Sequence, residues 1–88
     1  MNHRHRKTLH ALFAHPVSAN IDPKSVEAVL KELGAEIEER HGSKFAVTLN
    51  GHTMLFGHAH HSLPTSEVHD VKKFLVQCGI DPARDYPL

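Results

Sequence analysis

The residues best suited to chemistry in this sequence are histidines, of which the chain has 10 among 88 residues. Three of them lie close together in His58-Ala59-His60-His61. An imidazole titrates near neutral pH, so it can pass a proton in a reaction, and its neutral form is a common metal ligand. Zinc prefers three or four ligands, however, and no cysteine or carboxylate pair accompanies this cluster. We therefore expect no metal and no other cofactor; the alternative is a histidine-rich metal site joined by His41, His52 or His69.

The composition favours one small domain without strong net charge. A length of 88 residues suits a single domain. Lys plus Arg and Asp plus Glu number 10 each, which argues against a protein that holds nucleic acid through bulk charge alone. A single cysteine cannot form an intramolecular disulfide, and no apolar run approaches the roughly 18 residues of a membrane span. We therefore expect a cytoplasmic protein that does not contact membranes.

Apolar residues at helical spacing predict two helices in the first part of the chain. The first covers residues 4–14, and His15-Pro16 ends it because a residue before proline avoids the α region. The second covers residues 23–33. Its start is marked by Asp22-Pro23, a good N-cap followed by a proline in the first turn, and its end by Gly34.

A last helix is predicted to end at Cys78. Thr65 or Ser66 can cap its first turn. Cys78 lies on the apolar stripe of this helix, so we expect a buried structural thiol and not a nucleophile. His69 on this helix and His10 on the first helix lie beside the apolar stripes, and both are expected to be exposed.

Three strands are predicted between the second and the last helix, at residues 35–40, 44–49 and 52–58. Asn50-Gly51 joins the last two strands and is a strong signal of a two-residue hairpin, because a type I′ turn requires a positive φ at both positions. Such a turn fixes the register of the pair. The register places five apolar residues on one face, which should be the core: Phe45, Val47, Leu49, Met54 and Phe56.

The opposite face of the predicted sheet carries the residues of chemical interest. Lys44 lies opposite Gly57, so its side chain has open space beside it. Ser43 lies opposite His58 at the same end of the hairpin, but this pair has the opposite side-chain parity to Lys44 and Gly57. The acidic residues of the first strand are the exposed side of an edge strand, where their charge discourages pairing between sheets: Glu36, Glu38 and Glu39.

The predicted order of elements is α–α–β–β–β–α, an α+β fold. Residues 23–80 form an αβββα core, in which a three-stranded antiparallel sheet packs on two helices, as in double-stranded-RNA-binding-like domains. Residues 1–22 add a basic N-terminal helix and a linker, and residues 81–88 form a C-terminal tail. The extra helix must bury its apolar stripe, and the open sheet face with Ala46 and Leu55 is one possible place for it.

Several short motifs in this order resemble the HicA family of toxins that cleave messenger RNA. The resemblance covers about residues 23–80. The matching segments are Leu33-Gly34-Ala35-Glu36 at a helix end, Gly42-Ser43-Lys44 at a turn, the strand that ends at His58, and Leu63-Pro64 before a helix that closes in Cys78-Gly79-Ile80.

This resemblance implies a type II toxin–antitoxin system. The toxin is a metal-independent ribonuclease, and a HicB antitoxin blocks it. We therefore expect mRNA and a HicB-like protein as partners, and no DNA contact by this chain alone. In the family pattern a catalytic histidine follows Gly-Ser, and here Lys44 stands at that position. A second histidine of the family matches His58.

Cleavage of RNA without a metal needs a base for the 2′-hydroxyl proton and an acid or a cation for the phosphate and the leaving oxygen. We assign proton transfer to His58 and stabilisation of the phosphate charge to Lys44, with Ser43 beside them. The residues expected to contact RNA are Gly42, Lys44, His60 and His61.

Two other functions remain open at this point. Lysine is a poor base near neutral pH unless it is desolvated, so the chain is alternatively a catalytically silent relative that binds RNA or a protein through the same surface. The zero formal net charge keeps a third alternative open, a small interaction module that binds metal through its histidines.

Overall fold

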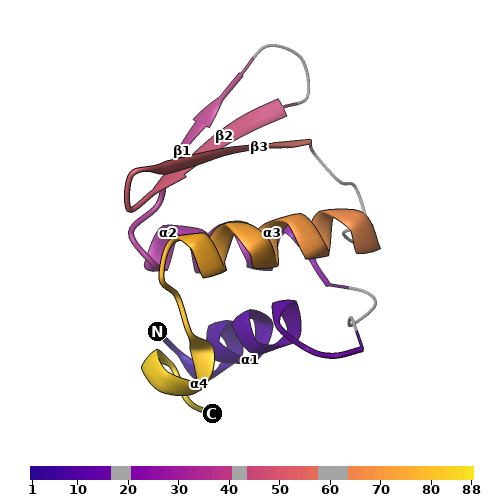
Figure 1. Ribbon diagram of the computed structural model, residues 1–88, viewed down its shortest axis with the longest axis vertical. Coiled ribbons are helices and arrows are strands. Elements are labelled where there is room, and N and C mark those ends of the chain that lie inside the picture. Colours follow the sequence, from indigo (N-terminus) through magenta and orange to yellow (C-terminus); the bar gives the residue numbers. More distant parts are fainter. Residues whose placement is uncertain (17–20, 41–43, 58–63) are drawn as a thin grey trace.

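The computed structural model of the chain describes residues 1–16, 21–40, 44–57 and 64–88. Three layers are visible in Figure 1: the sheet, then α2 and α3 beneath one face of it, then α1 and α4 beyond these helices. The predicted α+β class is confirmed. The elements are α1 (His3–Leu12), α2 (Pro23–Glu32), β1 (Glu36–Glu39), β2 (Lys44–Leu49), β3 (His52–Gly57), α3 (Thr65–Gln77) and α4 (Pro82–Asp85).

The three strands form one antiparallel sheet in the order β1-β2-β3. The predicted register between β2 and β3 is confirmed, with Lys44 opposite Gly57 and Val47 opposite Met54. Its cause is the turn, where Asn50 and Gly51 have φ values of 50° and 82°. Both angles lie in the left-handed region that a two-residue type I′ hairpin requires.

The core lies on both sides of the layer formed by α2 and α3. Val29 and Leu75 are 0% exposed, and Val47 of the sheet is also 0% exposed. On the far side of the layer, Leu9 and Leu12 of α1 are 0% and 1% exposed. These residues belong to one continuous apolar cluster, so the sheet, the two central helices and α1 share a single core.

The structure corrects the place that the sequence suggested for the N-terminal helix. α1 contacts α2, α3 and α4, and Figure 1 shows it on the side of the helices that is remote from the sheet. The open sheet face offers only Ala46 and Leu55 as apolar partners, and Leu55 stays 58% exposed. The stripe with Leu9 and Leu12 instead belongs to the same buried apolar cluster as the residues of the two central helices, so it packs on their outer side.

Polar contacts help to hold α1 in this place. Nδ1 of His5 lies 2.7 Å from Oε1 of Glu32, which joins α1 to the end of α2. The Nε2 group of His10 hydrogen-bonds the Tyr86 carbonyl at 2.8 Å, which joins α1 to the residue after α4. His10 is therefore half-buried, and the expectation that it is exposed is wrong because the C-terminal segment folds back over it.

Three boundaries also differ from the prediction. α1 ends at Leu12 and not at residue 14. The N-cap of α3 is Pro64, with no side-chain hydrogen bond, so neither Thr65 nor Ser66 caps this helix. The predicted tail contains α4, and the Asp81 carboxylate accepts hydrogen bonds from the first backbone N–H groups of this helix. No helix within the described ranges is long and apolar enough to cross a membrane.

The turn of the hairpin is fastened to the end of α3. The side-chain amide of Asn50 donates a hydrogen bond to the Cys78 carbonyl at 2.8 Å. The Cys78 thiol donates in return to the Leu49 carbonyl at 3.2 Å. These two bonds fix the turn end of the sheet against the helix layer, so the hairpin leads away from a fixed point toward Lys44 and Gly57.

We predict that Leu9→Ala lowers the free energy of unfolding by about 3 kcal/mol, because it removes a fully buried side chain and leaves a cavity between α1 and the central helices. Urea unfolding followed by circular dichroism measures the change. Lys7→Ala on the exposed side of the same helix is the control and should alter stability by less than about 0.5 kcal/mol. Equal effects of the two substitutions would show that α1 is not part of the core.

Candidate functional site: the open face of the sheet

The sheet presents one face to the helices and leaves the other uncovered by any element of the described chain (Figure 1). Side chains of four residues line a shallow hollow on the uncovered face: Arg40, Lys44, Thr53 and Leu55. The hollow combines two cations with a hydroxyl and an apolar side chain. That combination suits a ligand with negative charge and a flat apolar surface, such as a nucleotide.

Lys44 is the one predicted site residue that falls within the described ranges. It begins β2, is exposed, and lies opposite Gly57, as the hairpin register predicted. Among the described residues no carboxylate lies within ion-pair distance of its ammonium group. An exposed ammonium group without an acidic partner is suited to contact an anion.

The remaining predicted site residues lie outside the described ranges. The structure therefore does not test the pairing of Ser43 with His58, or the assignment of proton transfer to His58. The same holds for the predicted RNA contacts of Gly42, His60 and His61. The chain on either side of these segments is described, and Lys44 and Gly57 are adjacent across the hairpin.

The electrostatics of the open face differ from one strand to the next. β1 is an edge strand, and its carboxylates are exposed as predicted: Glu36, Glu38 and Glu39. Arg40 lies 3.9 Å from Glu38, a distance that gives an exposed ion pair little energy. Glu38 and Glu39 lie beside Ala46 and Phe45, at the same end of the sheet as Lys44. A polyanion is therefore repelled by the edge strand β1 and attracted by Lys44 on the neighbouring strand β2.

The structure adds Glu67 to this end of the sheet. A Cβ atom on Gly57 would lie 3.6 Å from Oε1 of Glu67, so the carboxylate lies close to the end of β3. Its Oε2 atom is buried and has no hydrogen-bond partner within the described chain. An unpaired buried carboxylate oxygen is costly and can accept a hydrogen bond from an incoming donor. Sequence reasoning missed Glu67, because an acidic residue in the first turn of a helix already has an electrostatic explanation.

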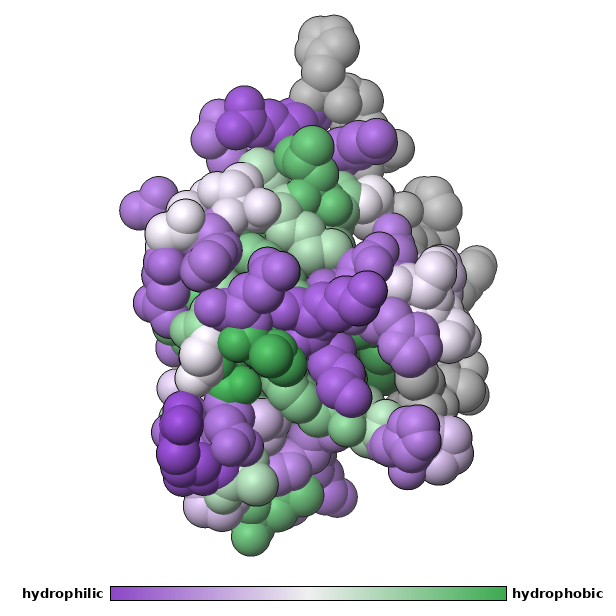
Figure 2. Space-filling view, viewed as in Figure 1, coloured by the Kyte–Doolittle hydropathy of each residue, from purple (hydrophilic) through white to green (hydrophobic). Residues whose placement is uncertain are grey.

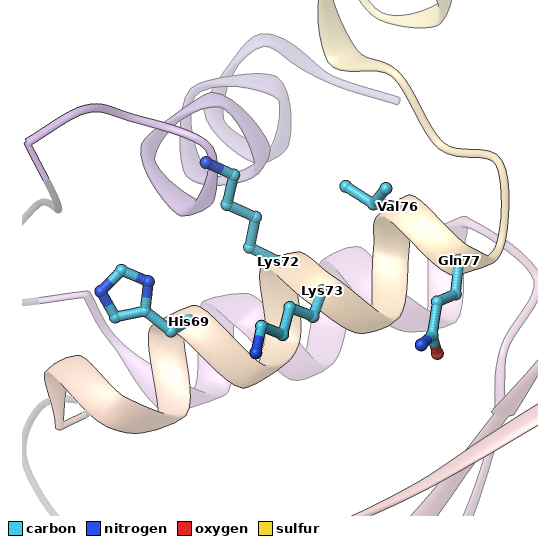
Figure 3. Close-up of a pocket in the computed structure, with 5 residues that line it drawn as sticks. All are labelled: His69, Lys72, Lys73, Val76 and Gln77. Carbon is cyan, nitrogen blue, oxygen red and sulfur yellow. The ribbon is translucent and has the colours of Figure 1, made fainter.

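The exposed side of α3 carries a second hollow, lined by His69, Lys72, Lys73, Val76 and Gln77. Figure 3 shows Lys72 and Val76 directed toward the layer of α1, and Lys73 and Gln77 directed toward the sheet, with His69 beside them. These side chains diverge from the helix and do not converge on a shared point. Figure 2 shows mainly hydrophilic side chains across this face of the molecule, with separate hydrophobic areas between them. We interpret this surface as the solvent-exposed side of a helix and not as a binding site.

Of the three histidines that could have completed a metal site, the structure describes His52 and His69, while His41 lies outside the described ranges. His52 begins β3 and Gly57 ends it, so the chain that follows Gly57 starts about 17 Å from His52. His69 is exposed on α3, as predicted. Within residues 1–16, 21–40, 44–57 and 64–88, no group of three histidine, cysteine or acidic residues is placed to hold a metal ion. The cluster at residues 58–61 lies outside these ranges.

Cys78 is buried, as its place on the apolar stripe predicted, with 7% of its surface exposed. Burial raises the pKa of the Cys78 thiol, because the thiolate loses its hydration. The thiol also donates to the Leu49 carbonyl, which favours the protonated form. The group is therefore structural and unsuited to act as a nucleophile.

Comparison with known proteins adds nothing to this geometry. No protein-family model, curated protein or solved structure gives a significant match to the chain. What is established is an α+β domain with N-terminal helices, a three-stranded antiparallel sheet and a C-terminal helical part. A function must therefore be argued from the residues of the open face.

We predict that Cys78 in the folded protein reacts with a soluble disulfide reagent at least about 100-fold more slowly than in 8 M urea, because the reactive thiolate is disfavoured by burial and access is blocked. Spectroscopic thiol titration measures both rates. Fast reaction in the folded state, with unchanged circular dichroism, would contradict a structural role for this thiol.

Proposed function

We propose that the chain is a HicA-like toxin that binds RNA through the open face of its sheet, near Lys44. One observation carries the proposal: Lys44, at the position of the family's catalytic histidine, is an exposed cation without an acidic partner in the described chain. Its side chain lines the hollow on the sheet face that the helices leave uncovered. A phosphate group can reach this ammonium without displacing any element of the fold.

The arrangement of the elements supports the same proposal. Both central helices pack on one face of a three-stranded antiparallel sheet, and the order from α2 to α3 is αβββα. This is the layout of double-stranded-RNA-binding-like domains, to which the HicA toxins belong. A single apolar side chain, Leu55, is exposed beside the cations and offers a surface on which a base can pack.

In the proposed reaction the residues divide the chemical work. Lys44 binds the phosphate and stabilises the negative charge that grows on it during attack by the 2′-hydroxyl group. His58 takes the hydroxyl proton, with Ser43 beside it. The 2′ oxygen displaces the 5′ oxygen from phosphorus, and the leaving 5′ oxygen takes a proton from water. Glu67 lies at the same end of the sheet and can accept a hydrogen bond from a group in the site. A HicB-like antitoxin would inhibit the toxin by covering this end of the sheet.

A second candidate is a catalytically silent domain that binds RNA with the same face. The observation that favours it is the exposure of Lys44, because a solvated ammonium group cannot replace the histidine as a proton acceptor. The two candidates share the surface and differ in whether His58 completes a reaction. Binding and cleavage therefore have to be measured separately.

For cleavage, we predict that expression of the wild-type chain arrests growth and that a HicB-like protein relieves the arrest. His58→Ala should lower the rate of RNA cleavage by about 100-fold or more, because it removes the proton acceptor. Lys73→Ala on α3 is the control and should cleave at the wild-type rate. Undiminished cleavage by His58→Ala would refute the assigned roles, and RNA binding without any cleavage would favour the silent domain.

For binding, we predict that Lys44→Ala weakens the affinity for single-stranded RNA and reduces the slope of log K against log salt by about 0.7, the contribution of one phosphate contact. Fluorescence anisotropy at several salt concentrations gives the slope. Lys73→Ala removes the same charge from α3 and should leave the slope unchanged. Equal slopes for all three proteins would exclude Lys44 from the RNA contact.

A further inference from the structure

The basic residues of α1 lie at its N-terminus, the end at which a helix favours negative charge. Residues 3–7 read His-Arg-His-Arg-Lys and form the first half of α1, and the first turn holds no acidic residue. A helix N-terminus carries partial positive charge, so cations there are unfavourable for helix stability. Asn2 caps the helix by accepting from the His5 N–H at 2.8 Å, which leaves the charges of the side chains uncompensated.

Part of this basic run has a structural role. His5 lies against Glu32 at 2.7 Å, and the Arg6 guanidinium donates to the Pro87 carbonyl at 3.5 Å. Both side chains are half-buried and help to dock the helix. The placement of these two residues is thereby explained by contacts inside the fold.

The other part of the run has no such role. His3, Arg4 and Lys7 are exposed, and within the described chain none of them forms an ion pair or a side-chain hydrogen bond. Residues three and four apart are neighbours on a helix surface, so these three side chains form one patch. The patch costs helix stability and contributes no contact to the fold. Residues that break a local rule without a structural gain are expected at functional surfaces.

We propose that His3, Arg4 and Lys7 on α1 form a second RNA-contacting surface, which binds the phosphate backbone independently of Lys44. This inference rests on the proposed function, because it takes RNA as the ligand. α1 lies in the layer farthest from the sheet (Figure 1), and the molecule is 36 Å long. The layer of α2 and α3 lies between the two surfaces, and packed helices alone are about 8–10 Å apart. The separation of the two surfaces therefore exceeds the Debye length of about 8–10 Å in physiological salt, so they act separately.

The choice of RNA follows from the chemistry of the patch. It contains a guanidinium, an ammonium and an imidazole, but no large apolar side chain is exposed with them on α1. A helix that binds a lipid surface needs an apolar side to insert, and the apolar side of α1 is buried through Leu9 and Leu12. A flexible polyanion requires only the cations.

The test is salt-dependent binding of single-stranded RNA by the full chain. The double variant Arg4→Gln/Lys7→Gln should reduce the slope of log K against log salt by about 1.4, the sum of two phosphate contacts. The control variant Lys24→Gln/Lys73→Gln loses the same charge from exposed positions on α2 and α3 and should keep the wild-type slope. Combination with Lys44→Ala should give an additive loss, because distant sites contribute independently. Circular dichroism checks that each variant remains folded.

The outcomes separate this inference from the proposed function. If Lys44→Ala reduces the slope and the Arg4/Lys7 variant does not, the second surface is refuted while RNA binding by the sheet stands. Equal losses from the Arg4/Lys7 and control variants would also refute it, since net charge alone would then explain binding. If the wild-type chain binds no RNA, both proposals fail. Binding to vesicles of phosphatidylserine that depends on Arg4 and Lys7, without RNA binding, would assign the patch to a lipid surface and overturn the inference.

Discussion

The fold depends on a pair of helices that must be covered on both sides. α2 and α3 contribute Val26, Val29, Leu30, Val68, Val71, Phe74 and Leu75 to the core, and all of these side chains are buried. The sheet covers one side of this pair and α1 covers the other. Burial of apolar area on both sides gives a chain of 88 residues a continuous core. A single interface between the sheet and the helices would bury only part of this apolar area. The consequence is that the open sheet face and the outer side of α1 stay free of contacts from the other described elements.

Local signals in the sequence were sufficient for the elements and the register. Asn50-Gly51 determines the hairpin because these two residues alone adopt the positive φ values that the turn requires. The ends of α2 are also set locally, by the Asp22 cap and Pro23 at its start and by the positive φ of Gly34 after its end. Helix packing between layers is not a local property. The stripe with Leu9 and Leu12 indicated that α1 must be buried but not against which surface, since the second apolar side of α2 and α3 is visible only when both helices are in place. The half-buried His10 follows from the same packing.

The candidate site could be predicted to a smaller extent. Lys44 was placed correctly because the Asn50-Gly51 turn fixes the hairpin register, and the register fixes the position of Lys44 opposite Gly57. Glu67 could not be found in this way, since its proximity to Gly57 depends on how α3 sits below the sheet. Gly57 was expected to leave open space opposite Lys44, but the Glu67 carboxylate from α3 lies beside this glycine. The roles of Ser43 and His58 stay predictions that derive from the family resemblance.

The formal net charge of zero conceals a separation of charges on the surface. Carboxylates gather on the edge strand β1, at Glu36, Glu38 and Glu39, while Arg4, Lys7 and Lys44 have no acidic partner in the described chain. Electrostatic attraction in physiological salt extends about 8–10 Å, which is short compared with the 36 Å length of the molecule. A bound polyanion therefore responds to the charges of the patch that it touches and not to the sum over the chain. Zero net charge consequently argues against long-range, non-specific attraction of nucleic acid, but it does not argue against contacts at two separate basic surfaces.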